Sequence, residues 1–485
     1  MNDFSRKGAK TQKRTFRHAA ALSTFASLRE KSFVVAVIVM GLLSSNVAAQ
    51  KTPDAFRGAD TTDQKSIGDL KWFDVFKDDE LQKLVRTALV NNYDLRTAVA
   101  RIDAARANVG LARSEQFPQF DGSADLTTTR GSRNGQLGAL GGGRTRNFGN
   151  VFLNLLSFEL DVWGRLRQQT KAARAELRAS EDDRKTVLII VVGDVAGGYF
   201  SLLELDSELD LAKRTLASRE ESLRLIRARQ QGGLATALDV RQAEELVYQA
   251  SRTIPDIERL IEQTENQLSF IAGNNPGPIT RGQPLDQQET LPLVPAGLPS
   301  SLLERRPDIR AAEQNLVAQR ALVSVAKKAF FPRISLTGLL GFQSDQLSNL
   351  FAGPSRAWTF VPQVTQPIFT GGRLKSDVKF ARAEQEFALV QYQQTIQNAF
   401  REVADALIQY RKVREIRAQQ ELLVATLRDR SRLAYLRYEG GVDTLLNALD
   451  SDRELFEAEL NLTKTKRDEL LSLVQLYRAL GGGWQ

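Results

Sequence analysis

The chain has 485 residues, a formal net charge of +8 at pH 7, no cysteine and one histidine, His18. Beyond residue 50 it therefore cannot build a Ser-His or Cys-His catalytic pair, or a zinc site made of histidine and cysteine. It also lacks the glycine-rich phosphate loops of the Walker or dinucleotide type. Catalysis by Asp and Glu alone stays open on composition, but we expect no enzyme, no cofactor and no metal site.

Residues 1–49 have the features of a signal peptide. Several Lys and Arg residues precede the apolar run Phe33–Leu43, and small residues suit cleavage between Ala49 and Gln50. The run falls short of the roughly 20 residues that a permanent membrane anchor needs. Because these residues hold eight Lys or Arg and two Asp or Glu, the remainder carries a net charge of only about +2, which gives no argument for nucleic-acid binding.

The remainder of the chain follows one order of elements twice. In the first structural repeat, 50–274, we expect helices at 94–113, 163–231 and 236–271 and strands near 118–128 and 150–161. A proline-rich linker at 275–299 follows. In the second structural repeat, 300–485, we expect helices at 307–328, 371–439 and 444–480 and strands near 332–343 and 358–369.

The duplication rests on matched motifs. Phe117-Pro118 aligns with Phe331-Pro332, and WGRLRQQTKAARAE, from Trp163, aligns with GGRLKSDVKFARAE, from Gly371. Two copies are too few for a solenoid, but they suit a pseudo-symmetric unit that oligomerises. The expected helices at 163–231 and 371–439 would each be roughly 100 Å long at 1.5 Å per residue, which is typical of a coiled coil, a fibre or a tube.

Paired glycines separate each long helix from the helix that follows it. Gly232-Gly233 and Gly440-Gly441 supply residues that readily adopt the positive φ that ends a helix. Thr236 can cap the helix after the first pair, with Asp239 three residues later as in a capping box. Thr444 can cap the helix after the second pair.

The expected strands have a period of two. In residues 332–343 the two alternating sets are apolar Ile334, Leu336, Leu340 and Phe342, and polar Arg333, Ser335, Thr337 and Gln343. About ten residues suffice for a tilted strand to cross a bilayer. A soluble hairpin packed on helices is the alternative. Four strands cannot close a barrel alone, but several copies of the chain can close one together.

Several ordered motifs resemble one family. Phe360–Leu407 (FVPQVTQPIFTGGRLKSDVKFARAEQEFALVQYQQTIQNAFREVADAL) is similar to the outer membrane efflux proteins of the TolC/OprM type, and within them to the NodT-like efflux subgroup. The segments LLERRPDIRAAEQNL, GDLKWFDVFKDDELQKLVRTALVNNYDL and the closing LGGGW agree, so the resemblance spans Gly68–Trp484. It implies an α+β membrane protein that forms a homotrimer. Each subunit would give four strands to a twelve-stranded outer-membrane β-barrel, which a periplasmic α-helical barrel continues as a coiled-coil tunnel with a mixed equatorial belt.

The resemblance also implies a periplasmic gate. Leu446 falls on a constricting leucine, Asp450 on a ring aspartate, and Arg453 on the arginine that ties this aspartate. At 100° per residue these three positions lie within about 60° of one another on a helix. Asn447 stands where some members carry a second aspartate. The alternative is that Asp450 and Arg453 form an ordinary solvated ion pair, worth only a few tenths of a kcal/mol.

Further residues near the glycine turns take roles by the same resemblance. Tyr438 falls on a tyrosine that links neighbouring coils, and Asp239 occupies in the first repeat the position of Asn447 in the second. Family members often begin with a lipidated cysteine, whereas this chain has Gln50 at the expected start. We therefore expect no lipidation and anchoring in outer-membrane lipid through the barrel.

The expected function is an exit duct in the outer membrane of a Gram-negative bacterium, with a periplasmic tunnel. It would join a periplasmic adaptor (membrane fusion protein) and an inner-membrane transporter, expected to be proton-driven, in a tripartite pump for small toxic compounds. A conduit for type I protein secretion with an ABC exporter is the main alternative. A periplasmic coiled-coil scaffold without a channel is a third interpretation.

Overall fold

A computed structural model describes residues 55–57, 66–130, 132, 134, 145–288, 297 and 299–484. Residues 53–485 form one compact unit. The expected signal peptide with its cleavage site at Ala49 and Gln50 lies outside the described residues.

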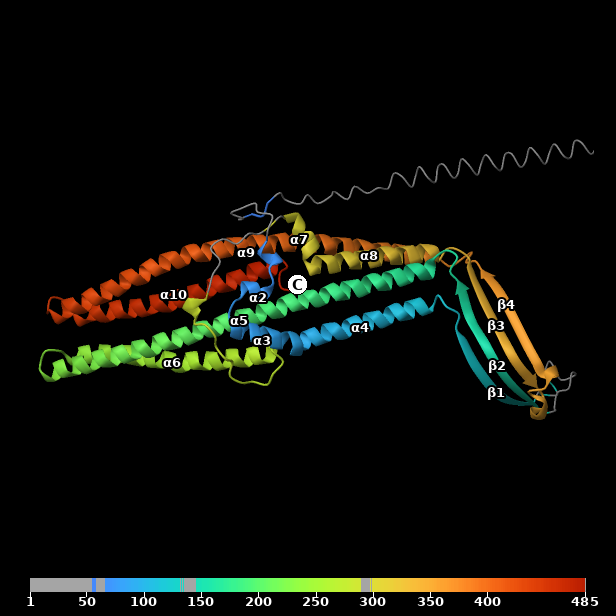
Figure 1. Cartoon of the computed structure of the whole chain (residues 1–485), viewed down its shortest axis with the longest axis horizontal. Helices are drawn as coiled ribbons and strands as arrows, with labels where there is room; N and C mark the ends of the chain where they lie inside the picture. The colour runs from blue at the N-terminus through green and yellow to red at the C-terminus, as the bar shows by residue number, and fades with distance from the viewer. Residues whose placement is uncertain are drawn as a thin grey trace, which may run out of the picture. The chain divides into compact units, whose positions relative to one another are not determined.

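Two long helices extend from the strands to the glycine turns (Figure 1). They are α5 (Arg165–Gln231) and α9 (Arg373–Glu439), of 67 residues each. Near the turns α5 packs on α6 (Ala237–Ile271) and α9 packs on α10 (Leu445–Ala479), so each forms a two-helix coil. Near the strands, α4 (Tyr93–Ser114) packs on α5, and α8 (Pro307–Lys328) packs on both long helices. These bounds lie within two residues of those expected.

Short elements that the sequence analysis did not predict surround the middle of the long helices. They are η1 (Ile67–Asp69), α2 (Trp72–Val75), α3 (Asp79–Asn91), η3 (Leu285–Gln287) and α7 (Pro299–Arg305). Asp78 caps α3, because its Oδ1 accepts hydrogen bonds from the N–H groups of Glu80 and Leu81 at 2.9 and 3.1 Å. The expected linker contributes η3 to the described structure, and the chain segment before α4 contributes to the core.

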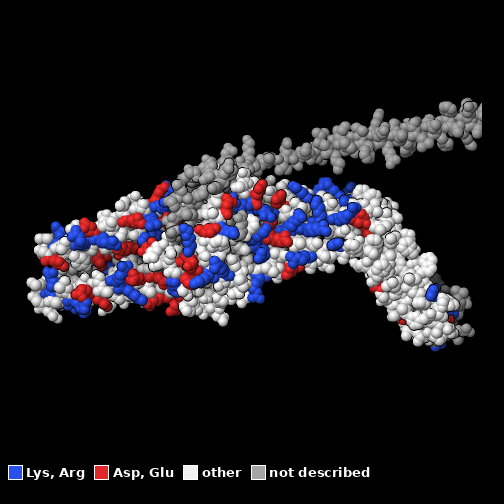
Figure 2. All heavy atoms as spheres, in the orientation of Figure 1, with Lys and Arg blue, Asp and Glu red and all other residues white. Residues whose placement is uncertain are grey.

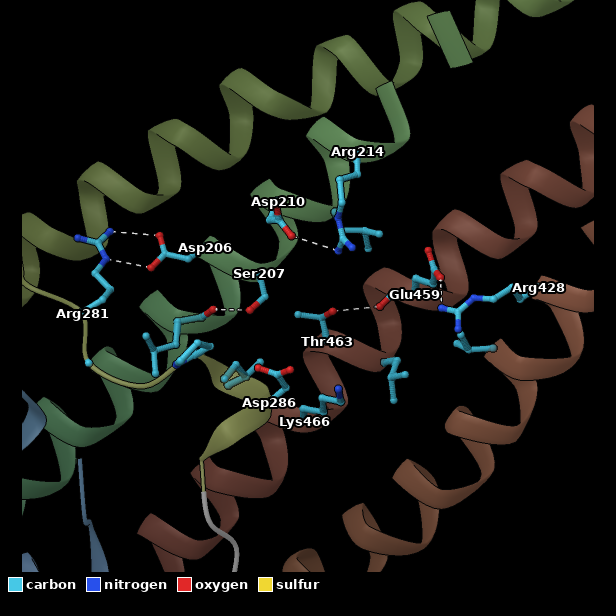
Figure 3. Close-up of a pocket in the computed structure, with 17 residues that line it drawn as sticks. Asp206, Ser207, Asp210, Arg214, Arg281, Asp286, Arg428, Glu459, Thr463 and Lys466 are labelled. Carbon is cyan, nitrogen blue, oxygen red and sulfur yellow. Dashed lines mark hydrogen bonds and ion pairs between the residues drawn. The ribbon is translucent and has the colours of Figure 1, made fainter. Parts of the chain in front are cut away.

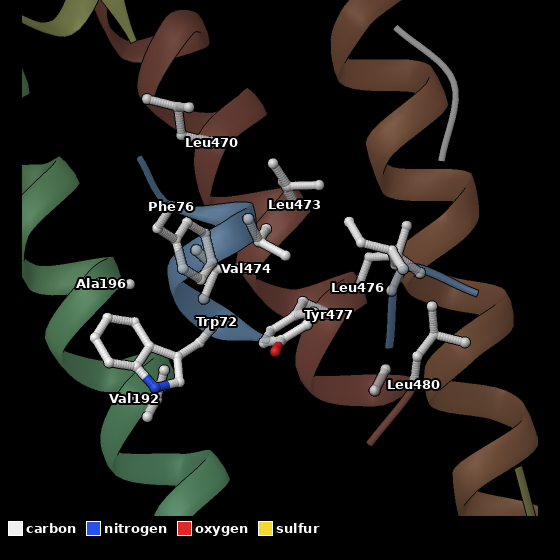
Figure 4. Packing of buried hydrophobic residues seen from close by; sticks show 14 of the residues in the cluster. Trp72, Phe76, Val192, Ala196, Leu470, Leu473, Val474, Leu476, Tyr477 and Leu480 are labelled. Carbon is white, nitrogen blue, oxygen red and sulfur yellow. The ribbon is translucent and has the colours of Figure 1, made fainter. Parts of the chain in front are cut away.

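The main hydrophobic core lies where these short elements meet α5, α9 and α10. Trp72 and Phe76 of the N-terminal segment pack among Val192 and Ala196 of α5 and Tyr477 of α10 (Figure 4). Burial of a large apolar side chain stabilises a fold by about 1.5–3 kcal/mol. Among the described helices only α5 has a window apolar enough to cross a membrane, and 56% of that window is buried. Packing in this core therefore accounts for its hydropathy.

Four antiparallel strands form one sheet in the order β1-β2-β3-β4. They are β1 (Phe120–Arg130), β2 (Thr145–Leu160), β3 (Arg333–Ser344) and β4 (Arg356–Thr365). Two further short helices, η4 (Leu347–Asn349) and η5 (Gly353–Ser355), lie between β3 and β4. Strands β1 and β4 each have one edge without a partner within the described residues.

The strand register gathers apolar side chains on one side of the sheet. Leu340 of β3 pairs with Leu153 of β2 and with Trp358 of β4, and residues directly opposite each other share a face. The other face is largely polar, and there Asn150 and Asn154 of β2 donate hydrogen bonds to Asp125 and Ser123 of β1 at 2.7 and 3.0 Å. This division is typical of a strand set that meets lipid on one side and water on the other.

Two strand bounds differ from those expected. Strand β2 begins at Thr145 rather than near 150, and it contains a bulge between Leu155 and Phe158. Before the bulge the odd-numbered residues of β2 point to the apolar face, and after it the even-numbered residues do. Leu155 and Phe158 therefore lie on the same face of the sheet. Strand β4 ends at Thr365 rather than near 369. Pro367 has no N–H to extend a ladder, and Gly371-Gly372, with φ of +58° and +86°, turn the chain into α9.

Candidate gate at the helix tips

The turns between α5 and α6 and between α9 and α10, here called the tips, have the same backbone geometry. Gly233 and Gly441 have φ of +74° and +71°. The residue after each glycine donates to the last turn of the preceding helix, Leu234 N to Arg229 O at 2.8 Å in the first tip. No atom lies within 4 Å of a Cβ added at either glycine. Glycine is therefore required here by the backbone conformation and not by crowding.

The two tips differ in how the next helix is capped. In the first, Thr236 N donates to Asp239 Oδ2 at 2.7 Å and Asp239 N donates to Thr236 Oγ1 at 3.2 Å, the expected capping box. In the second, Thr444 occupies the cap position but its side chain makes no capping hydrogen bond. Thr444 therefore has the expected N-cap position, but the expected side-chain cap does not form, and the nearby carboxylate of Asp443 accepts from the N–H of Thr444 itself.

Asp443 organises the second tip through three donors. It accepts from Thr444 N at 2.8 Å, from Asn447 Nδ2 at 2.6 Å and from Arg437 Nε at 3.1 Å. These bonds hold the pKa of Asp443 below its usual value, with the Thr444 N–H as the largest cause. Asn447 is thus engaged by Asp443, a residue that the sequence analysis did not select. An acidic residue two positions after a Gly pair was the available signal.

Leu446, Asp450 and Arg453 lie together on the exposed side of α10. Leu446 is 56% exposed, although the neighbouring Leu445 is buried against α5 and α6. Arg453 Nη2 donates to Asp450 Oδ1 at 2.5 Å, and both side chains remain accessible. The structure therefore brings the three predicted gate residues onto one accessible face. Within one chain it pairs the two charges locally.

The interface between the α5–α6 coil and the α9–α10 coil, here called the seam, contains contacts that the sequence analysis missed. Arg219 of α5 donates to Asp452 of α10 at 2.8 Å and to the carbonyl oxygen of Leu246 of α6 at 3.1 Å. Closer to the tips, the guanidinium of Arg229 lies 4.7 Å from the ring centroid of Tyr438. Tyr438 thus joins the two coils of a single chain. Asp452 is partly buried, although Asp450 and Arg453, two positions before it and one after it, are accessible, so its position on the helix face was the only signal for it.

Further along the same seam, two carboxylates lie close together. Arg467 Nη1 donates to Glu204 Oε2 at 3.2 Å, and Lys464 Nζ lies 3.5 Å from Glu208 Oε1. Burial, reinforced by the neighbouring Glu208, raises the pKa of Glu204 to about 7, while Arg467 acts in the opposite direction. The interface between the coils therefore contains, far from the tips, a carboxyl group whose pKa is close to neutral.

A cavity of about 500 Å³ lies beside this seam, between α5, the segment around η3, and α10 (Figure 3). Several of its charges are paired with one another, as in Arg281 with Asp206 at 2.9 Å and Arg428 with Glu459 at 2.6 Å. Over the described part of the chain, no group of three or more His, Cys, Asp or Glu side chains is placed to hold a metal ion. The Arg428–Glu459 pair ties α9 to α10, and the Arg281–Asp206 pair ties the segment before η3 to α5.

The model of the family "Outer membrane efflux protein" matches residues 84–274 and 298–482. The chain belongs to this family. It is 39% identical over 425 residues to the solvent efflux pump outer membrane protein SrpC of Pseudomonas putida, covering 87% of this chain and 90% of the relative. It is also 38% identical over 441 residues to outer membrane protein OprJ of Pseudomonas aeruginosa, covering 90% and 91%.

Solved structures of outer-membrane channels share the fold. The outer-membrane channel OprN superposes with a TM-score of 0.82 at 29% identity, covering 90% of this chain and 98% of OprN. The open state of the MtrE channel of Neisseria gonorrhoeae gives 0.81 at 32% identity, covering 90% and 96%. The predicted family, the α+β fold of TolC-type channels, the efflux role and the outer-membrane location are thereby confirmed. The family is one of transport conduits.

Proposed function

We propose that three copies of this chain form the exit duct of a tripartite efflux pump. The duct carries small toxic compounds from the periplasm to the exterior, together with a periplasmic adaptor and a proton-driven inner-membrane transporter. Relatives at 38–39% identity are named for pumps of solvents and toluene, which supports small apolar compounds as the cargo.

One observation carries the proposal. A four-stranded sheet with one continuous apolar face and two open edges joins directly to two 67-residue helices, α5 and α9. Open edges must pair inside a bilayer, since every backbone polar group needs a partner there. Pairing β1 of one copy with β4 of the next closes twelve strands in a trimer. The attached helices then form a tube of roughly 100 Å.

The tips supply a place to close the tube. Leu446 would narrow the opening, and three copies of Asp450 around one axis would each need a cation, for which Arg453 is available. Asn447, held by Asp443, and Asp239, held by Thr236, would shape the rim next to the glycine turns. Opening would separate the coils, so the Arg219–Asp452 and Arg229–Tyr438 contacts would favour the closed state.

The test is assembly and conduction by the full chain. Detergent extracts should give a mass near three times that of one chain and conducting channels in planar bilayers. In a strain lacking its own efflux duct, the chain should lower the accumulation of a solvent-like dye. A monodisperse monomer that keeps its β-sheet signal contradicts the duct. Export of a polypeptide but not of the dye favours the secretion alternative.

A further inference from the structure

Exposed cations line one face of each long helix next to the sheet. On α5 the face carries Arg167, Lys171, Arg174 and Arg178, at spacings of four, three and four residues. On α9 it carries Lys375, Lys379 and Arg382, at spacings of four and three. Such spacings place side chains on one side of a helix. Figure 2 shows Lys and Arg gathered on the helices beside a sheet that carries little charge.

Most of these cations have no counterion. In the described part of the chain no carboxylate pairs with Lys171, Arg174, Arg178, Lys375, Lys379 or Arg382. Closer to the tips the same helices pair their cations, as in Arg224–Glu221 and Arg430–Glu454. The cations also lie near helix N-termini, whose first turns contain no acidic residue. The helix dipole disfavours positive charge there, so helix stability does not explain their position.

The internal repeat has the same charges in both halves. Arg165, Arg167, Lys171 and Arg174 correspond, 208 positions later, to Arg373, Lys375, Lys379 and Arg382. Arg167 and Lys375 differ in chemistry but not in charge. At this position the two halves share the positive charge but not the side chain. The shared property is therefore the attraction of the charge for anions.

The helix layer has an acidic side opposite the basic one. Glu176 of α5 and Glu384 of α9 occupy matching repeat positions and line one cavity together with Asp183 and Glu402. Each glutamate comes two residues after a cation of the basic face, Arg174 on α5 and Arg382 on α9. Two residues correspond to 200° around a helix, so the glutamates point away from that face. Next to the sheet, from Arg167 to Arg178 and from Lys375 to Arg382, the basic face therefore carries no carboxylate, and the first ones on it are Glu181 and Glu386.

Aromatic side chains mark the level at which the cations begin. Trp163 stacks on Phe331 with centroids 5.1 Å apart, and the two are 43% and 46% exposed. Beside them, Lys328 Nζ donates to the carbonyl oxygen of Gly164 at 3.1 Å. Arg167 Nη2 approaches the same glycine, so two cations meet there. Exposed aromatic rings at the end of a membrane strand are typical of the lipid–water interface.

We propose that these cations form a basic collar that binds the phosphates of anionic phospholipids in the periplasmic leaflet of the outer membrane. The collar consists of Lys171, Lys375 and Lys379, which have no counterion in the described part of the chain, together with Lys328 and Arg167, of which Arg167 also pairs with Asp161 at 3.2 Å. Phosphates would meet the cations while acyl chains meet the aromatic rings and the apolar sheet face, a combination that a soluble polyanion would not use. The collar goes beyond the duct function and fixes the depth of the barrel in the bilayer.

Native mass spectrometry of the full-length trimer tests the collar, with phosphatidylglycerol or phosphatidylethanolamine added to the detergent solution. The variant Lys171→Gln/Lys375→Gln/Lys379→Gln should lose about fivefold in affinity for phosphatidylglycerol per cation removed, with no change for phosphatidylethanolamine. The variant with Arg at the same three positions keeps the charge and should bind like the parent. Arg214→Gln/Arg224→Gln/Arg432→Gln, nearer the tips, should also bind like the parent.

Channel conductance and heat resistance of the trimer are measured on the same samples, so a failure to assemble is distinguished from a loss of lipid. Unchanged affinity of the Gln variant for phosphatidylglycerol overturns the collar. Equal binding of both lipids by the parent also overturns it. A Gln variant that loses affinity for soluble peptidoglycan fragments, and not for lipid, would assign the cations to the cell wall instead. Each of these results leaves the duct function standing.

Discussion

Arg219 Nε of α5 donates to Asp452 Oδ2 of α10 at 2.8 Å, although Arg219 is only 5% exposed. The guanidinium also lies 5.1 Å from the ring centroid of Phe456. A buried ion pair contributes little net stability, but removal of one partner leaves an uncompensated charge. The pair therefore holds α10, which carries the predicted gate, in one position against α5.

We expect Asp452→Asn to destabilise the closed tip by about 2–3 kcal/mol, below the range for a fully buried pair because Asp452 stays partly accessible. The trimer should dissociate at a lower temperature and open more often in planar bilayers. Arg224→Gln, which removes an exposed pair with Glu221, is the control and should change neither property. If the two variants behave alike, the Arg219–Asp452 pair has no special role.

The raised pKa of Glu204 predicts a pH-dependent stability. Its carboxyl group titrates near 4.5 in the unfolded chain and near 7 in the folded one. Between these values the unfolded chain has released the proton that the folded chain still binds. Stability from this group is therefore greatest below about pH 4.5, falls by at most about 1.4 kcal/mol per pH unit up to about pH 7, and is constant above that.

Glu204→Gln should remove this slope. Thermal unfolding at pH 5 and at pH 7.5 should show a smaller loss of stability with rising pH in the variant than in the parent. Glu220→Gln changes an exposed carboxylate on the same helix and should keep the parent's slope. If the melting temperature of the parent does not change between the two pH values, the folded chain does not keep a proton on Glu204.

The sheet register predicts unequal tolerance for charge on its two faces. Leu336 pairs with Phe158 and Pro362 on the apolar face, whereas Ser335 pairs with Glu159 and Gln363 on the polar one. Leu336→Lys should cost about 2–4 kcal/mol if the apolar face meets lipid. Ser335→Lys should be tolerated, because water and Glu159 can accept the charge. The yield of heat-resistant trimer measures the effect of each variant. Equal yields would contradict the assignment of the apolar face to lipid.

Sequence patterns sufficed where local chemistry determines the structure. Long runs of helix-forming residues between glycine pairs predicted α5 and α9, and the Thr236–Asp239 capping box predicted the start of α6. The resemblance to a family then supplied the fold class and the location. The bulge in β2 has no local pattern by which it could be recognised. Helix α3 does have one, with Asp78 as cap and the apolar residues Leu81, Val85 and Ala88 at helical spacing, and the sequence analysis overlooked it.

The seam contacts could not be predicted because they depend on which helices become neighbours. Arg219 and Asp452 are 233 positions apart in the chain, and Glu204 meets Arg467 from another helix. Each of these residues resembles an ordinary surface charge of a long helix when it is seen in sequence alone. The gate residues, by contrast, rest on the family resemblance and on exposure in one chain, so their role stays a prediction.

Three features favour Leu446, Asp450 and Arg453 as the gate. They share the exposed face of α10 within four turns of the tip, and the seam holds that helix against α5. In a trimer three Asp450 carboxylates would face one narrow opening, and Arg453, which donates to Asp450 at 2.5 Å, would offset part of their mutual repulsion and leave the carboxylates nearest the opening. An opening lined by carboxylates favours cations over anions.

The last prediction therefore concerns conduction. Arg453→Ser should loosen the closed state by leaving three carboxylates to repel one another, and Leu446→Ala should widen the opening by removing apolar packing. Both should increase single-channel conductance in planar bilayers, whereas Asp450→Ala should lower the preference for cations over anions. Leu234→Ala, which truncates an exposed leucine at the other tip, is the control for general loosening. If the three gate variants conduct like the parent, the constriction lies elsewhere and the Asp450–Arg453 pair is only surface charge.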